Sequence, residues 1–238
     1  MAQYDIIGKN YSEMIRVEPV KIFVQRPSAI ALLGGVKGKS VLDIGCGDGI
    51  ISRMVAGRGA MVVGIDPSSK QIEIAQEEEK SVPLGIKYQI ASIQTFAFSE
   101  KFDSALAVMV LCYANDLQEL QSFFNQTFSL LKKGGSFVII DFNREVLPVG
   151  GSYYNRFFTR RPKDKIRIEW KVPGVKNYFT EVRYFSIKEF EACAKAAGFK
   201  NIKFTNLAPT NEGVEKMGAK YWKQFIEQPI WFGLTMTK

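Results

Sequence analysis

The stretch VLDIGCGDGI, residues 41–50, combines a short apolar run, two acids and three glycines. Residues 40–44 (SVLDI) have the apolar, branched side chains of a buried strand, and residues 51–59 (ISRMVAGRG) are predicted to be helical. The glycines therefore lie at a strand-to-helix turn, where a backbone without Cβ atoms can bend tightly and approach a ligand. In an open parallel sheet, such a turn borders the ligand crevice.

The alternation of strands and helices continues along the chain. Apolar runs predict further strands, which fall at residues 61–65, 86–90, 104–110 and 136–141. Residues 115–135 have helical spacing, with Asp116 as the N-cap and Gly134 as the C-terminal stop. Residues 186–199 form a second such helix, with capping-box spacing between Ser186 and Glu189 and with Gly198 as its stop. This order predicts an α/β fold with a doubly wound, mostly parallel sheet.

Composition narrows the class of protein. The 238 residues are 46% hydrophobic and 24% charged, which is typical of a single globular domain with one core. With no signal-like start and no apolar run of about 18 residues, we expect a soluble cytoplasmic protein without membrane partners. The three scattered cysteines do not have the spacing of a disulfide framework or zinc site. The absence of histidine excludes histidine-based triads and general bases.

An acid at the end of the second strand suggests the kind of ligand. Asp66, in the stretch GIDPSS, can accept hydrogen bonds from both hydroxyls of a ribose. A dinucleotide fingerprint would require glycine at position 50, which is Ile50. A nucleoside cofactor without a pyrophosphate therefore fits the turn better than a dinucleotide.

Four ordered stretches carry a family resemblance: VLDIGCGDG, GIDPS, FDSALAVMVLCY and LLKKGGSFVIIDF, within residues 37–142. Through them the sequence resembles the class I S-adenosylmethionine-dependent methyltransferases. The resemblance implies a Rossmann-like seven-stranded sheet whose last, antiparallel strand is FGLTMTK, residues 232–238. It also implies S-adenosylmethionine as cofactor, S-adenosylhomocysteine as product, and no metal.

The resemblance also implies which residues bind the cofactor. They are Tyr11, Asp43, Gly45, Cys46, Gly47, Asp66, Pro67, Ser92, Ile93 and Met109. Asp43 would orient the cofactor's ammonium group, Asp66 would hold the ribose, and Ser92 with Ile93 would meet the adenine. The family often has an acid at the position of Ser92. Taken alone, Ser92 is equally compatible with a helix cap, and Met109 with a place in the core.

Segments outside the sheet are expected to enclose the substrate. Residues 1–36 are predicted to form an N-terminal lid, although Tyr11 fits a packed surface helix equally well. Residues 144–185 form a basic, aromatic insertion with most of the net charge of +8, expected as a mobile loop followed by antiparallel strands. Residues 210–228 form a second insertion, to which Trp231 adds a further aromatic wall. The substrate candidates are Tyr4, Tyr113, Arg144, Tyr153, Tyr154, Tyr221 and Trp222.

Three functions are compatible with these features. The first is methyl transfer to a small, planar or anionic molecule, with catalysis mainly by positioning. Nitrogen is the favoured acceptor, since no residue identifies itself as a general base. The second is RNA methylation, with the basic insertion on the phosphates. The third is a non-catalytic cofactor-binding subunit.

Overall fold

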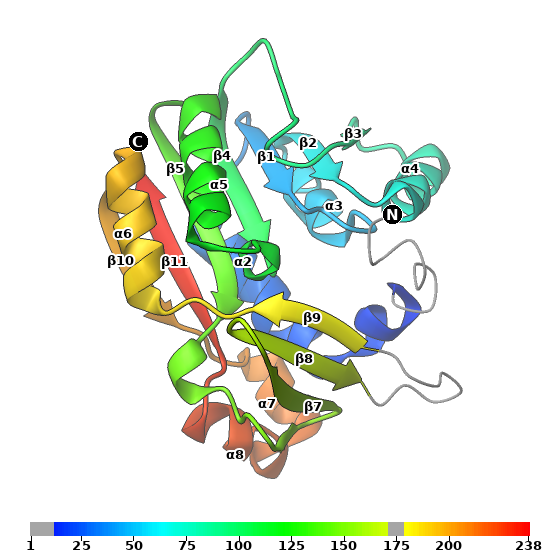
Figure 1. The fold of residues 1–238 in the computed structure, drawn as a ribbon. Coiled ribbons are helices and arrows are strands. Elements are labelled where there is room, and N and C mark those ends of the chain that lie inside the picture. Colours follow the sequence, from blue (N-terminus) through cyan, green and yellow to red (C-terminus); the bar gives the residue numbers. More distant parts are fainter. Residues whose placement is uncertain (1–11, 171–178) are drawn as a thin grey trace.

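The computed structural model describes residues 12–170 and 179–238 (Figure 1). A seven-stranded sheet forms its centre, in the order β10-β11-β5-β4-β1-β2-β3. The strands are β1 (Ser40–Ile44), β2 (Met61–Asp66), β3 (Lys87–Ile90), β4 (Phe102–Val108), β5 (Leu131–Phe142), β10 (Lys200–Asn206) and β11 (Trp231–Thr237). β1 to β5 pair in parallel, and β11 runs antiparallel to both β5 and β10. The predicted α/β fold and its antiparallel last strand are confirmed.

Two predicted boundaries are wrong. β4 ends at Val108 rather than at residue 110, because Met109 takes a left-handed backbone conformation with φ of 60°. Gly134 does not end the preceding helix. That helix, α5 (Leu117–Leu130), stops at Leu130, and Gly134 lies inside the irregular first part of β5.

Helices α5 and α6 (Ile187–Ala197) cover one face of the sheet (Figure 1). The predicted caps form: Asp116 accepts a hydrogen bond from the amide of Glu119, and Ser186 and Glu189 form a capping box. Gly198 follows α6 with φ of 100°, a conformation that favours glycine. Phe124 of α5 packs against Phe190 of α6 with ring centroids 6.3 Å apart, so the two helices share one apolar layer with the sheet.

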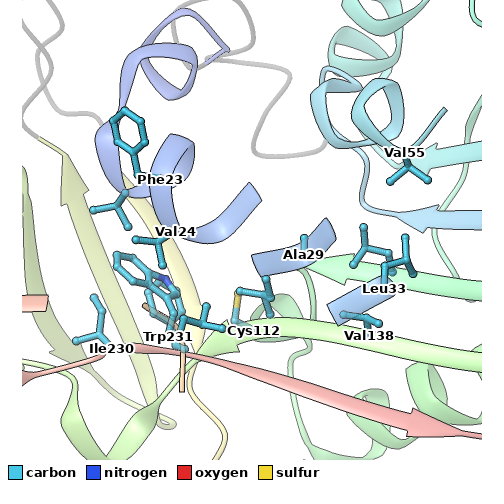
Figure 2. Packing of buried hydrophobic residues seen from close by; sticks show 14 of the residues in the cluster. Phe23, Val24, Ala29, Leu33, Val55, Cys112, Val138, Ile230 and Trp231 are labelled. Atoms are coloured by element: carbon cyan, nitrogen blue, oxygen red, sulfur yellow. The ribbon is translucent and has the colours of Figure 1, made fainter. Parts of the chain in front are cut away.

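The N-terminal helices cover the opposite face. Residues 12–17 are helical, and a π-helical turn η1 (Lys21–Gln25) runs directly into α2 (Arg26–Leu33). Figure 2 shows Val24 of η1 near Trp231 and Ile230, with Ala29 and Leu33 of α2 near Val138 of β5. Two further helices, α3 (Ile50–Ala56) and α4 (Ser69–Ser81), contact β2. No helix in the described ranges is both long and apolar enough to span a membrane.

A second, four-stranded antiparallel sheet lies within the basic insertion. Its strands are β6 (Ser152–Tyr153), β7 (Arg156–Arg161), β8 (Lys165–Trp170) and β9 (Phe179–Arg183). The expectation of a loop over its first half is therefore wrong. Alternate residues of β7 and β8, such as Phe158 and Ile168, are buried, and that period favours strands.

Shorter elements complete the fold. The 210–228 segment contains α7 (Asn211–Met217) and α8 (Ala219–Glu227). Two 3-10 turns, η2 (Leu111–Tyr113) and η3 (Arg144–Val146), follow β4 and β5. Since both turns follow the carboxyl ends of central strands, they lie at the edge of the sheet where parallel α/β folds bind ligands.

Candidate functional site

A cavity of about 530 Å³ opens at the carboxyl ends of β1, β2 and β4. Its floor includes residues of the glycine turn, and its walls include Asp66, Ser92 and Met109. η1 and α2 contribute Lys21 and Arg26 from the other side. A space of this size is within the usual range for small-molecule and cofactor sites.

The glycine turn is shaped by positive φ angles at the cavity floor. Gly45 and Gly47 have φ of 68° and 55°. The amides of Gly45 and Cys46 both donate to the carbonyl of Ile65, at 2.7 and 3.0 Å, which ties the turn to β2. A Cβ on Gly45 would lie 2.4 Å from Cγ2 of Val110. Only glycine therefore satisfies both the conformation and the close packing at position 45.

Asp66 holds the turn in place from the end of β2. One carboxylate oxygen accepts from the amide of Gly47 at 3.0 Å, and the other accepts from the amide of Ser68 at 2.9 Å. The side chain is only 9% exposed but lines the cavity. A carboxylate on the cavity wall is a suitable acceptor for the hydroxyls of a ribose.

Asp43 is placed differently from the other predicted cofactor residues. It is not part of the cavity wall. One of its carboxylate oxygens accepts a 2.6 Å hydrogen bond from the hydroxyl of Ser52 on α3. Burial raises the pKa of Asp43 to about 7, although the Ser52 hydrogen bond acts in the opposite direction. This hydrogen bond links the end of β1, directly before the glycine turn, to α3.

Cys46, Pro67, Ser92, Ile93 and Met109 all line the cavity. Their surroundings show additional roles for two of them. The hydroxyl of Ser92 lies 3.2 Å from that of Thr95, and its carbonyl accepts from the amides of Thr95 and Phe96, so it caps a turn. Met109 has a left-handed backbone conformation, which is unusual for a residue other than glycine. Its amide donates a 2.8 Å hydrogen bond to the carbonyl of Ile140, which holds this conformation in place.

Of the substrate candidates in the described part of the chain, Tyr113 lines the cavity. The others do not line it. Three of them donate hydrogen bonds to partners outside the cavity. Tyr153 donates to the carbonyl of Gln228, Tyr154 donates to that of Tyr221, and Trp222 donates to that of Gly213.

The two tyrosine contacts join the basic insertion to α8 and to Gln228 directly after it, and the Trp222 contact joins α8 to α7. Arg144 lies over the ring of Tyr184 and pairs with Glu189 at 3.6 Å. The candidates Tyr4 and Tyr11 lie outside the described residues.

Sequence reasoning missed several charged residues of the cavity wall. Lys21, Arg26, Asp48 and Glu119 line it, and of these four only Asp48 lies within a sequence motif. Burial lowers the pKa of Lys21 to about 8. The cations Arg156 and Arg26 also lower this pKa, whereas the acids Glu18 and Asp48 raise it. Burial raises the pKa of Asp48, against the effect of Arg16, whose Nε lies 3.5 Å from it. An acid within the quoted glycine turn is the one signal that could have indicated Asp48.

Comparisons with known proteins identify the family and the fold. The profile of a family described as "Methyltransferase domain" matches residues 23–203. The ubiquinone biosynthesis O-methyltransferase of Pelagibacter ubique is 38% identical over 109 residues, which are 46% of this chain and 44% of that protein. The demethylmenaquinone methyltransferase of Tropheryma whipplei is 29% identical over 187 residues, 77% of this chain and 75% of that one.

A solved structure is similar over nearly the whole chain. The amino pentose methyltransferase of Micromonospora echinaspora, solved with S-adenosylmethionine bound, has a TM-score of 0.66 and 16% identity, with 95% of each chain covered. At that identity the likeness is one of fold. Fold and glycine turn together define the class as a Rossmann-like, class I S-adenosylmethionine-dependent methyltransferase. The chain belongs to the methyltransferase-domain family.

Proposed function

We propose that this protein transfers the methyl group of S-adenosylmethionine to a small-molecule acceptor. The observation that carries the proposal is the cavity at the carboxyl ends of β1, β2 and β4, with the glycine turn and Asp66 on its wall. The cofactor supplies an already electrophilic methyl group, so the protein's task is to align a nucleophile and exclude water. The chain spans less than half the length of its Pelagibacter relative, so that protein's reaction is not transferred here.

The cavity residues suggest how the cofactor is held. Asp66 would accept from the ribose hydroxyls, Ser92 and Ile93 would contact the adenine, and Gly45 to Gly47 would lie against the methionyl part. Asp43 would act through the turn that it braces. Arg26, which lines the same cavity, is suited to the cofactor's carboxylate, because a guanidinium binds that group well.

We infer that the acceptor atom is a nitrogen. A neutral nitrogen with a free lone pair needs little more than alignment, and the chain contains no histidine to remove a hydroxyl proton. Free, buried cysteines support a cytoplasmic location.

The charge of the insertion favours a small molecule over RNA. Five of its arginines face an acid: Arg144 faces Glu189, Arg156 faces Glu18, Arg161 faces Glu181, Arg167 faces Glu169, and Arg183 faces Asp164. Cations that are paired within the protein are less available for phosphate groups. The insertion is therefore better suited to structure than to an RNA surface.

Calorimetric titration tests the proposal. We expect micromolar binding of S-adenosylmethionine and S-adenosylhomocysteine, followed by methyl transfer to a member of a panel of amines and nitrogen heterocycles. Total bacterial RNA, titrated over a salt series, is the alternative acceptor. Transfer to RNA alone would establish the RNA function, cofactor binding without any transfer would favour the non-catalytic subunit, and no cofactor binding would refute the site.

A further inference from the structure

A small inner pocket of about 20 Å³ adjoins the cofactor cavity. Four residues line both spaces: Lys21, Gln25, Met109 and Tyr113. β7, β8, β9 and β11 supply much of the remaining wall, so the pocket lies between the central sheet and the insertion. A volume near that of one water-sized sphere admits one or two atoms, and the rest of a bound molecule would stay in the larger cavity.

The polar side chains of this pocket are rich in hydrogen-bond donors. Trp231 and Arg156 are each only 1% exposed. The indole N–H of Trp231 and the Nε–H of Arg156 have no acceptor among the described residues. No Asp or Glu is among the described residues that line the pocket. Buried donors without acceptors are costly, so the arrangement favours a ligand that brings acceptors.

The charges around the pocket are not fully balanced. Arg156 pairs with Glu18 and lies over the ring of Trp170, its guanidinium carbon 4.3 Å from the centroid. Lys21 donates to the side-chain oxygen of Gln25 at 3.3 Å and forms no ion pair within the described ranges. The charged groups that act on Lys21 are the cations Arg26 and Arg156 and the acids Glu18 and Asp48, so three cations face two acids. The half-buried ammonium of Lys21 remains for another anion.

We propose that the inner pocket binds a carboxylate group of the methyl acceptor, held by Lys21, Arg156 and Trp231. This inference rests on the proposed function, and it adds the chemical class of the substrate: a small carboxylic acid that also carries the nitrogen acceptor. The two oxygens of a carboxylate match both the donors and the small volume. The body of the acid would lie in the main cavity beside Met109 and Tyr113, toward the cofactor.

Binding of matched acids and amides tests the inference. The probes are 2-, 3- and 4-aminobenzoate with their neutral aminobenzamide counterparts, titrated by calorimetry with and without S-adenosylhomocysteine. We expect at least one acid to bind about tenfold more tightly than its amide, because a charge-assisted hydrogen bond contributes that much. Lys21→Met should reduce the preference to about twofold or less, and Trp231→Phe should weaken binding of the acid about fivefold.

Lys223→Met provides the matched control, since Lys223 is a 71% exposed lysine on α8. It should keep the full preference for acids. Circular dichroism would show that every variant is folded. If the folded wild type binds no acid, binds acid and amide equally, or keeps its preference in Lys21→Met, the inference is wrong.

The pH dependence gives a second readout. Lys21 has a pKa of about 8, and the charged groups that act on it are Glu18, Arg26, Asp48 and Arg156. Raising the pH from 7 to 9 should therefore weaken binding of the acid and leave binding of the amide unchanged. A loss of S-adenosylhomocysteine binding with intact acid preference would refute the proposed function alone. Cofactor binding without acid preference would refute the carboxylate pocket alone.

Discussion

Asp66 has one observed role, in the glycine turn, and one proposed role, in ribose binding, and the two can be separated. Its carboxylate accepts from the amides of Gly47 and Ser68, and its place on the cavity wall suits the ribose. Asp66→Ala should weaken S-adenosylhomocysteine binding by about 1–3 kcal/mol, because hydrogen bonds to a charged acceptor are lost. Isothermal titration measures this change.

The 2′-deoxy analogue of S-adenosylhomocysteine isolates the ribose contact. If Asp66 binds the ribose, the substitution should weaken this analogue less than the parent compound. Asp103→Ala is the control. The carboxylate of Asp103 accepts hydrogen bonds from Ser40 and Lys132, and it is not part of the cavity wall. Equal losses for both ligands would mean that Asp66 acts only by holding the glycine turn.

At the scale of elements, Gly49 joins the glycine turn to α3. Its φ is 81°, and an added Cβ would lie 2.4 Å from the hydroxyl oxygen of Tyr88 on β3. Gly49→Ala therefore combines backbone strain with overpacking. We expect a loss of about 2–4 kcal/mol in the free energy of unfolding, measured with urea.

Gly38→Ala separates the two causes. Gly38 has a similar φ of 73°, but an added Cβ there would meet no atom within 4 Å. We expect Gly38→Ala to lower the free energy of unfolding by about 1 kcal/mol, because it adds backbone strain without a new contact. If both variants lose the same stability, the contact with Tyr88 does not limit the turn.

At the scale of the whole molecule, one buried ion pair joins the N-terminal helices to the insertion. Glu18 and Arg156 are 6% and 1% exposed. Glu18→Gln leaves the guanidinium buried without its counter-charge and should cost about 3–5 kcal/mol in urea unfolding. Glu227→Gln breaks an exposed pair with Lys223 on α8 and should cost about 0.5 kcal/mol or less. Similar losses in both would show that the buried pair does not stabilise the assembly of the two parts.

Stability of the whole molecule should also depend on pH near neutrality. Burial raises the pKa values of Asp43 and Asp141 from 3.8 to about 7. A raised carboxyl pKa stabilises the fold below about pH 4, and this contribution is lost as the pH rises toward 7. The free energy of unfolding should therefore fall between pH 4.5 and 7.

Asp43→Asn tests the origin of this slope. Its carboxamide oxygen can still accept from Ser52, but the group no longer titrates. The slope should decrease by about 1 kcal/mol per pH unit. Asp103→Asn is the control, since hydrogen bonds from Lys132 and Ser40 lower the pKa of Asp103 to about 2, outside this window. An unchanged slope in Asp43→Asn would mean that Asp43 is already ionised in the folded protein.

The sequence could predict what depends on local patterns. The strand cores, the caps Asp116 and Ser186, and the glycine turn all follow from residues near in the chain. The end of β4 could not be predicted, because the left-handed Met109 is held by a distant strand through the carbonyl of Ile140. The positions of Tyr153 and Trp222 could not be predicted for the same reason, because their hydrogen-bond partners come from other segments.

By itself, then, the sequence determined the α/β class, the strand-to-helix turn and the cofactor type. Hydrophobic periodicity, helix capping and glycine spacing reflect local backbone preferences, which depend only on residues close together in the chain. Only the tertiary structure decided which charges line the cavity and the inner pocket. Lys21, Arg156 and Trp231 lie far apart in the chain and meet because η1, β7 and β11 share one buried cluster. Burial lowers the pKa of Lys21, and acids from other segments pair with arginines of the insertion. Both effects depend on packing rather than on composition.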